Sequence, residues 1–209
     1  MRYEDIRIQL VDMPSTSPDF VDSSLVPLAR LADAMLVCVD LSSPDCLEQE
    51  GWVSKPLQNA RIELVRGRVA SIVNTWLPRQ LPALLVATKA DHPDAADALE
   101  LLRELVGNRL PMVVVSRERI ESLEAFRRAC FDLVGMVRVY SKAPGKEADR
   151  GSPYLLPVGA TVLDFAERVH QELRDKFDFG RVWGERGEGQ RIGRDYVLAD
   201  RDVIEVHRR

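Results

Sequence analysis

This sequence of 209 residues contains no apolar run long enough to span a membrane, no cysteines at metal-binding spacing and no cluster of histidines. No stretch approaches the roughly 20 apolar residues that a membrane-spanning helix needs, and no secretory signal precedes the first predicted strand, so we expect no membrane partner. The 3 cysteines lie far apart without metal-type spacing, which favours reduced thiols and a cytoplasmic protein. His92, His170 and His207 are scattered, which argues against a histidine metal site.

The net charge argues against nonspecific binding of nucleic acid over the whole surface but allows binding at a local basic patch. Hydrophobic residues make up 45% of the chain and charged residues 30%, as in a packed globular protein. The net charge of −4 is too small to name a partner, and it argues against wholesale electrostatic capture of nucleic acid. A local basic patch remains compatible with it.

Apolar runs alternate with helical patterns up to about Gly135. The expected strands are Asp5–Val11, Ala34–Leu41, Ala83–Ala87 and Pro111–Val115. The expected helices are Ser24–Leu31, Gln58–Trp76, Pro93–Val106 and Ser122–Val134, and Gln49–Pro56 is interpreted as a surface loop. Because strands such as "AMLVCVDL" are apolar except for one aspartate near the end, both of their sides must be covered, which predicts a parallel α/β sheet with helices on both faces.

After residue 135 the regular alternation of strands and helices gives way to a strand, a loop rich in proline and glycine, and a short second strand. Residues 136–209 are therefore predicted to form a separate small α+β domain that folds on its own. Thr161 followed by Asp164 resembles a capping box at the start of a helix that continues to Phe177. Short strands are expected around this helix, among them Arg181–Trp183 and Asp202–His207.

Polar motifs follow three of the predicted strands. Asp12 ends the first strand, "TKAD" at Thr88–Asp91 follows the third, and Ser116 follows the fourth. The carboxyl ends of parallel strands share one rim, where such sheets bind ligands. A carboxylate there can hold a Mg²⁺-bound water beside a phosphate, and another can accept both N–H groups of a guanine edge. Taken singly, each residue could equally cap a turn or a helix.

In this order the motifs resemble those of the Obg-like translational GTPases, above all the DRG branch with a C-terminal TGS domain. The stretches "VRVYSKAPGK", "LPVGATVLDFAERVH" and "GQRIGRDYVLADRDVIEV" carry the more specific part of the resemblance. It implies a partial P-loop GTPase-type domain over residues 1–135 and a β-grasp TGS domain over residues 136–209. It also implies that Asp12 contacts Mg²⁺, that Thr88, Lys89 and Asp91 read guanine, and that the Ser116–Arg117 backbone meets the guanine carbonyl.

The sequence departs from this family in three places. Ser15 stands where the family has the glycine that allows a switch to pivot, and Arg117 replaces the usual alanine. No G-x-x-x-x-G-K-[ST] phosphate loop occurs, since "APGKEA" at Ala143–Ala148 has only its Gly-Lys pair. Nothing in the sequence therefore holds phosphates, and we expect the chain alone neither to bind GTP or GDP with Mg²⁺ nor to hydrolyse GTP.

Two explanations stay open at this point. The chain is either the C-terminal part of a longer GTPase, which we favour, or a natural relative without the phosphate loop; the codons upstream of Met1 would decide. The corresponding functions are a GTP-binding protein of translation or the ribosome, and a non-enzymatic adaptor that binds ribosomes or structured RNA through the TGS domain. Trp183 and Tyr196 lie among many basic residues, as an RNA-contacting surface would require. These are Arg181, Arg186, Arg191, Arg194, Arg201, Arg208 and Arg209.

Overall fold

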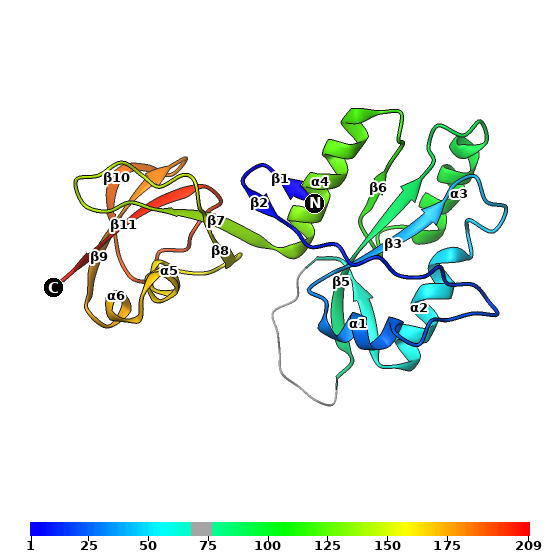
Figure 1. Cartoon of the computed structure of the whole chain (residues 1–209), viewed down its shortest axis with the longest axis horizontal. Coiled ribbons are helices and arrows are strands. Elements are labelled where there is room, and N and C mark those ends of the chain that lie inside the picture. The colour runs from blue at the N-terminus through cyan, green and yellow to red at the C-terminus, as the bar shows by residue number, and fades with distance from the viewer. Residues whose placement is uncertain (68–76) are drawn as a thin grey trace. The chain divides into compact units, whose positions relative to one another are not determined.

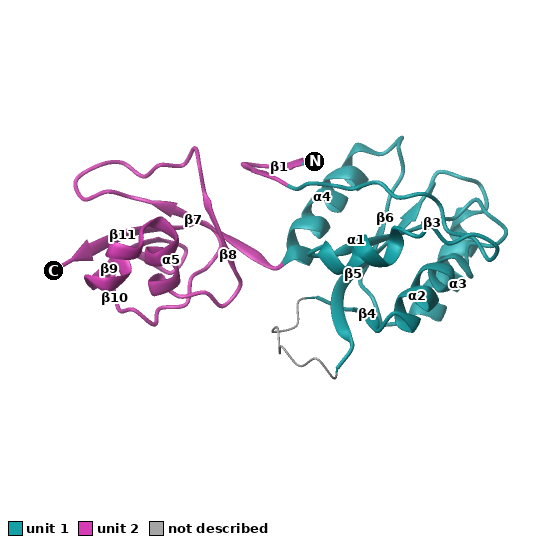
Figure 2. Cartoon of the chain, turned by 60° about the horizontal axis from the view of Figure 1, so that its bottom comes forward, with its two compact units in different colours: residues 1, 8–134 teal, residues 2–7, 135–209 magenta. Residues whose placement is uncertain are grey.

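A computed structural model describes residues 1–67 and 77–209 of the chain (Figure 1). The chain divides into two compact units (Figure 2). The α/β unit comprises Met1 and Ile8–Val134, and the C-terminal unit comprises Gly135–Arg209 together with Arg2–Arg7. Within the described ranges, every helix is too short or too polar to cross a membrane.

The α/β unit is built on a parallel sheet around one long strand, β5 (Arg79–Thr88). The three partners of β5 all run parallel to it. They are β3 (Met35–Asp40), β4 (Ile62–Val65) and β6 (Met112–Val114). Leu85 and Ala87 of β5 contribute to one apolar cluster, and Leu84 and Val86 contribute to another. Alternate residues thus bury both faces of the strand, which explains its continuous apolar run.

Helices cover both faces of this sheet, as predicted (Figure 1). They are α1 (Leu25–Leu31), α2 (Gln49–Asn59), α3 (Ala95–Val106) and α4 (Ile120–Val134). Residues of α1, α2 and α3 join the first apolar cluster, whereas Cys130 and Leu133 of α4 join the second. The fold class expected from the alternating pattern is therefore confirmed for this unit.

Two predicted elements of the α/β unit are wrong. The segment Asp5–Val11 is not one strand, because the backbone of Ile8 pairs with that of Met1 and only Ile6–Arg7 is extended as β2. Of the expected helix over Gln58–Trp76, only Gln58 and Asn59 are helical within the described residues, where they end α2. Arg61, with a φ of 60°, turns the chain out of α2, and Ile62–Val65 then pairs with β5 as β4. The rest of that segment, residues 68–76, lies outside the described residues.

The Gln49–Pro56 segment, interpreted as a loop, is also wrong, since it forms most of α2. Gly51 and Pro56 weaken its helical pattern, yet Pro56 lies inside the helix. Packing of Leu57 into the apolar core, where it is fully buried, outweighs this local propensity.

The C-terminal unit is a mixed five-stranded sheet with helices packed on one face (Figure 1). Its strand order is β10-β9-β11-β7-β8, and only β11 and β7 pair in parallel. The strands are β7 (Met136–Ser141), β8 (Tyr154–Pro157), β9 (Phe177–Gly184), β10 (Gly187–Ile192) and β11 (Asp202–Arg208). The helices are α5 (Val162–Val169) and α6 (Gln171–Asp175).

The start of α5 is the capping box that the sequence predicts. The Asp164 amide donates to the Thr161 hydroxyl, and the Thr161 amide donates to the Asp164 carboxylate at 2.7 Å. Val162, Phe165 and Ala166 point into the core against Val182 and Ile204 of the sheet. The single helix expected up to Phe177 is interrupted at His170, whose extended backbone (φ −169°, ψ 134°) separates α5 from α6.

A short N-terminal hairpin completes the C-terminal unit. Its strands are β1 (Arg2–Tyr3) and β2 (Ile6–Arg7), and Glu4 and Asp5 lie at the turn between them. Both carboxylates of the turn accept hydrogen bonds from the buried Arg138 guanidinium of β7. The first residues of the chain therefore find their partners far away in the sequence.

Candidate functional site

The loops that follow β5 and β6 lie side by side at the carboxyl end of the parallel sheet. The Val115 amide donates to the Ala87 carbonyl at 2.8 Å, and the Ala90 amide donates to the Val115 carbonyl at 3.3 Å. These backbone bonds hold the loop containing Lys89 and Asp91 against the loop containing Ser116. The structure thus brings together the two motifs that the sequence placed on one rim.

Asp91 and Ser116 are joined directly. The buried Ser116 hydroxyl donates to Asp91 Oδ1 at 2.6 Å and accepts from the Glu118 amide at 3.1 Å. The hydrogen bond from Ser116 is the main reason that the pKa of Asp91 lies below its ordinary value. Asp91 is therefore an exposed, fixed carboxylate at neutral pH, and it can accept paired hydrogen bonds from a ligand edge.

Ser122, at the start of α4, fixes Ser116 in turn. The Ser116 amide donates to the Ser122 hydroxyl at 3.1 Å, and that hydroxyl donates to the Ser116 carbonyl at 2.9 Å. The Arg117 side chain is exposed. An arginine at this position therefore takes no space in the apolar core.

Lys89 is oriented by Asp40, a residue that the sequence motifs do not include. Its backbone is left-handed, with a φ of 57°, and its Nζ lies 2.6 Å from Asp40 Oδ2 and 3.3 Å from Ser42 Oγ. Burial alone would raise the pKa of Asp40, but hydrogen bonds from Lys89 and Ser42 outweigh burial and lower that pKa. Asp40 ends β3, so the rule used for the other rim residues could have identified it.

Thr88 has a structural contact at the same rim. Its hydroxyl donates to the Val39 carbonyl at 3.0 Å and so ties β5 to β3 beside Asp40. The side chain of Thr88 therefore supports the loop, and the groups of the "TKAD" segment that face outward are those of Lys89 and Asp91.

Asp12 is exposed, and no hydrogen bond or ion pair links it to the other rim residues within the described ranges. Its charge acts on β3, where burial first and Asp12 second raise the pKa of the Cys38 thiol. Ser15 is not among the residues with a left-handed backbone, so serine at this position is unstrained.

The donor set around Asp12 does not fit a magnesium site built by this chain. In residues 1–67 and 77–209, no three acidic, histidine or cysteine side chains are close enough to share a metal ion. Protein-bound Mg²⁺ needs carboxylates together with waters or phosphates in octahedral geometry. A magnesium contact by Asp12 therefore stays a prediction.

Comparison with known proteins places this geometry in context. Residues 137–208 match the TGS domain family. Over 128 residues the chain is 28% identical to an uncharacterized GTP-binding protein of Methanocaldococcus jannaschii, which covers 60% of this chain and 33% of that protein. It is 24% identical to developmentally-regulated GTP-binding protein 1 of Xenopus laevis, with 99% of this chain and 71% of that protein covered. Ribosome-interacting GTPase 1 of Saccharomyces cerevisiae is 29% identical over 61% of this chain and 34% of its own length.

The fold has a counterpart among solved structures. The YchF GTPase of Schizosaccharomyces pombe superposes with a TM-score of 0.58 over 88% of this chain and 75% of that chain, at 9% identity. The chain thus combines a parallel α/β unit with a segment that matches the TGS domain family. Its sequence is similar to those of the DRG/Obg-like GTP-binding proteins, among them the relatives named above. The matched part covers about a third of the M. jannaschii and S. cerevisiae relatives.

Proposed function

We propose that the rim formed by Thr88–Asp91 and Ser116–Arg117 recognises the guanine base of GTP or GDP. In this proposal residues 1–135 are the part of a GTP-binding domain that reads the base, and residues 136–209 are the TGS domain. The names of the M. jannaschii, X. laevis and S. cerevisiae relatives all contain GTP-binding or GTPase, which supports a guanine nucleotide as the ligand. Phosphate binding and Mg²⁺ would require a phosphate loop, so we place them in a complete protein that contains one.

The contact between Ser116 and Asp91 carries this proposal. A guanine edge presents two adjacent N–H donors, and a fixed anionic carboxylate is the matching bidentate acceptor. The Ser116 hydroxyl binds one oxygen of Asp91 at 2.6 Å and so restricts the rotation of the carboxylate. Lys89, held at 2.6 Å by Asp40, adds an oriented side chain whose stem can lie against the base.

The test is Asp91→Asn in the protein with its phosphate loop. An amide loses the paired acceptors for guanine but can donate to the additional carbonyl of xanthine. We expect the affinity for GDP to fall roughly 10- to 100-fold and the affinity for XDP to rise, as measured by titration calorimetry.

Asp94→Asn is the matched control, because it makes the same chemical change at the highly exposed residue that precedes α3. It should leave both affinities unchanged. If Asp91→Asn bound GDP as tightly as the parent protein, Asp91 would not be the guanine reader.

We propose further that the protein acts at the ribosome in the cytoplasm, either as a GTPase or as an adaptor that does not hydrolyse nucleotide. The name of the yeast relative, ribosome-interacting GTPase 1, supports ribosome association. The adaptor is a candidate because the sequence contains no phosphate loop. Co-sedimentation with ribosomes at low salt tests the association, and a measurement of GTP hydrolysis on the same sample separates the two forms.

A further inference from the structure

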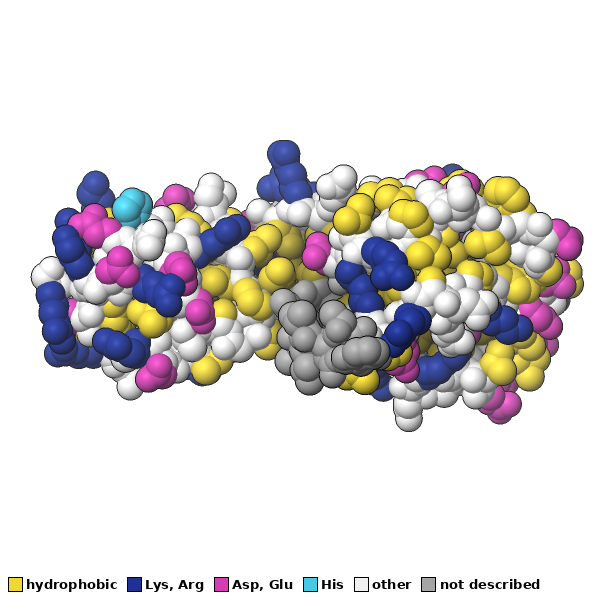
Figure 3. Space-filling view, turned by 90° about the horizontal axis from the view of Figure 1, so that it is seen from below, with side chains coloured by type: hydrophobic (Ala, Val, Ile, Leu, Met, Phe, Trp, Pro, Cys, Tyr) yellow, Lys and Arg dark blue, Asp and Glu magenta, His cyan; other side chains and the backbone are white. Residues whose placement is uncertain are grey.

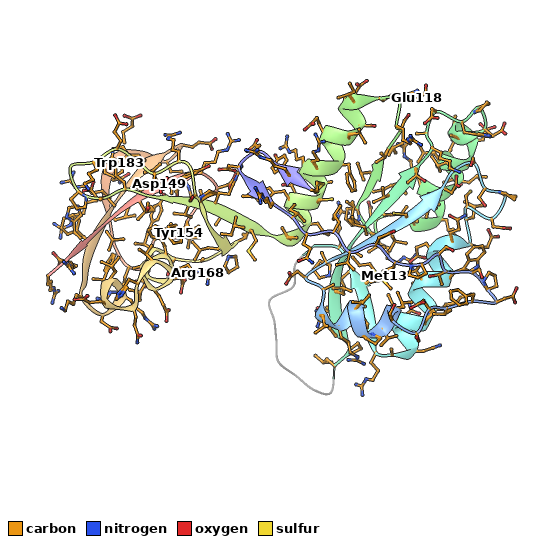
Figure 4. The ribbon with its side chains drawn as sticks, in the orientation of Figure 1. Met13, Glu118, Asp149, Tyr154, Arg168 and Trp183 are labelled. Atoms are coloured by element: carbon orange, nitrogen blue, oxygen red, sulfur yellow. The ribbon has the colours of Figure 1, made fainter. Side chains whose placement is uncertain are left out.

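One face of the sheet in the C-terminal unit carries no helix. Val182 and Ile204 point into the core beneath α5, so their neighbours on β9 and β11 point the other way. Directly paired residues on this side are Val203 with Trp183, Glu205 with Arg181, and His207 with Phe179. In Figure 4, Trp183 lies on the side of the sheet away from Arg168 of α5. We call this side the open face and define it by Lys142, Phe179, Arg181, Trp183, Arg191 and His207.

Planar and cationic groups alternate across the open face. The rings of Phe179 and His207 are stacked, with centroids 4.3 Å apart and planes 8° apart. The Arg191 guanidinium lies 4.0 Å from the centre of Phe179, so three planar groups from β10, β9 and β11 form one column. The Lys142 ammonium lies 4.4 Å from the centre of the Trp183 ring. Such groups offer stacking positions to unpaired bases.

One acidic residue of this face, Glu205, is neutralised within the protein, whereas Glu188 of β10, which pairs with Trp183, is exposed. Glu205 is buried, and it is paired with Lys142 Nζ and with His207 Nε2 at 2.7 Å. Arg181 and Arg191 are exposed neighbours on paired strands, and neither forms an ion pair with the described residues. The two arginines outnumber Glu188, so this part of the face still carries a local excess of positive charge. Figure 3 shows the helix-covered side, where acidic and basic side chains are intermixed instead.

We propose that the open face binds single-stranded RNA, with phosphates at Arg181 and Arg191 and bases stacked on the outer face of His207 and beside Trp183. The proposal deepens the ribosome association proposed above and rests on it, because ribosomal RNA offers unpaired bases and phosphates together. An acidic peptide would satisfy the arginines but would not use the aromatic groups, so the chemistry of the face favours RNA.

The experiment is fluorescence anisotropy with the full chain and a short labelled single-stranded RNA of mixed sequence. Arg181→Glu combined with Arg191→Glu should weaken binding by roughly 30-fold or more at low salt, and the salt slope should fall by about 1 for each phosphate that is no longer bound. Arg168→Glu is the matched control. It reverses an exposed charge on α5 and should change the affinity less than about twofold.

A second variant tests the stacking. Phe179→Leu keeps an apolar side chain but removes the central plane of the column, and it should weaken binding severalfold. A melting curve for this variant shows whether the fold is kept. If the fold is lost, the double arginine variant alone decides the question.

The possible results distinguish failure of the RNA proposal from failure of the proposed ribosome association. Equal RNA affinity of the parent and the double arginine variant would overturn the proposal. So would competition by polyglutamate as effective as competition by unlabelled RNA, since it would point to an acidic protein partner. If the parent fails to bind RNA but still sediments with ribosomes, the open face is refuted and ribosome association stands. If neither is observed, both are refuted.

Discussion

Replacing Arg138 by methionine should destabilise the C-terminal unit strongly. The side chain is 3% exposed, and its Nε and Nη2 donate to the two oxygens of Asp200 at 3.0 and 2.6 Å. Its Nη1 donates to Asp5 at 3.0 Å and also to Glu4. One guanidinium therefore satisfies three carboxylates, which lysine could not do with the same geometry.

The magnitude follows from what the variant leaves behind. Removing one partner of a fully buried ion pair costs about 3–5 kcal/mol because the other charge stays buried. Here the carboxylates of Glu4, Asp5 and Asp200 are 39%, 24% and 35% exposed, so water can solvate them in part. We therefore expect a loss of about 2–3 kcal/mol for Arg138→Met. For a unit of this size the melting temperature should fall by roughly 10–20 °C.

Hydrogen exchange of β7 and β11 reports this unit separately from the α/β unit, and urea unfolding followed by circular dichroism gives the free energy. Arg201→Met is the control, because Arg201 contacts Glu4 from a side chain that is 60% exposed and should contribute about 0–1 kcal/mol. If the two variants lost the same small amount, the reasoning about burial would be refuted.

The same cluster predicts a dependence on pH. Hydrogen bonds from Arg138 and Arg201 lower the pKa of Glu4. Burial would raise the pKa values of Asp5 and Asp200, but hydrogen bonds from Tyr140 and Arg138 to Asp5, and from Arg138 to Asp200, outweigh it and lower both. Groups with a lowered pKa stabilise the fold above their unfolded pKa of about 4 and lose that contribution as the pH falls through the folded values. The difference between the parent and Arg138→Met should therefore shrink below about pH 4.

Three further predictions concern other parts of the molecule. In the complete protein, Asp40→Ala should weaken GDP and XDP equally, because it frees Lys89 without touching Asp91; a change in base preference, measured by calorimetry, would contradict this. Thr161→Ala should cost the C-terminal unit about 1 kcal/mol in urea unfolding, whereas Thr161→Ser, which keeps the hydroxyl acceptor, should cost less. The chain alone should release phosphate from GTP only at the uncatalysed rate, because its sequence lacks the amide cradle and lysine of a phosphate loop. Hydrolysis that disappears with Asp12→Ala would disprove the last point.

The parts of the fold that could be predicted are those whose burial is visible in a local pattern. β3, β5 and β6 appear as continuous apolar runs because helices cover both sides of them. β10 was missed, since Gly187–Ile192 contains two glycines and its only buried residue is Ile192. In the same way, Ile62–Val65 became a strand through its pairing with β5, which no local pattern reveals.

In the candidate site, too, some residues could be predicted from local sequence patterns and others could not. Thr88–Asp91 and Ser116 could be found because each follows an apolar strand, and the structure brings their loops together. The ion pair between Asp40 and Lys89 depends on the pairing of β3 with β5. The hydrogen bond between Ser122 and Ser116 depends on where α4 begins. These supporting contacts join elements that lie apart in the sequence, so a motif alone does not predict them.

The hairpin at the start of the chain has a consequence for the order of folding during synthesis. Glu4 and Asp5 are made about 130 residues before their partner Arg138, and the Asp200 that shares it follows later still. The described residues of the α/β unit have all been made once Val134 has been added, whereas the C-terminal unit must wait for its last strand. At the usual 5–20 residues per second, that interval lasts roughly 4–15 seconds. Throughout it, the hairpin of residues 2–7 lacks the finished sheet against which Arg138 holds it.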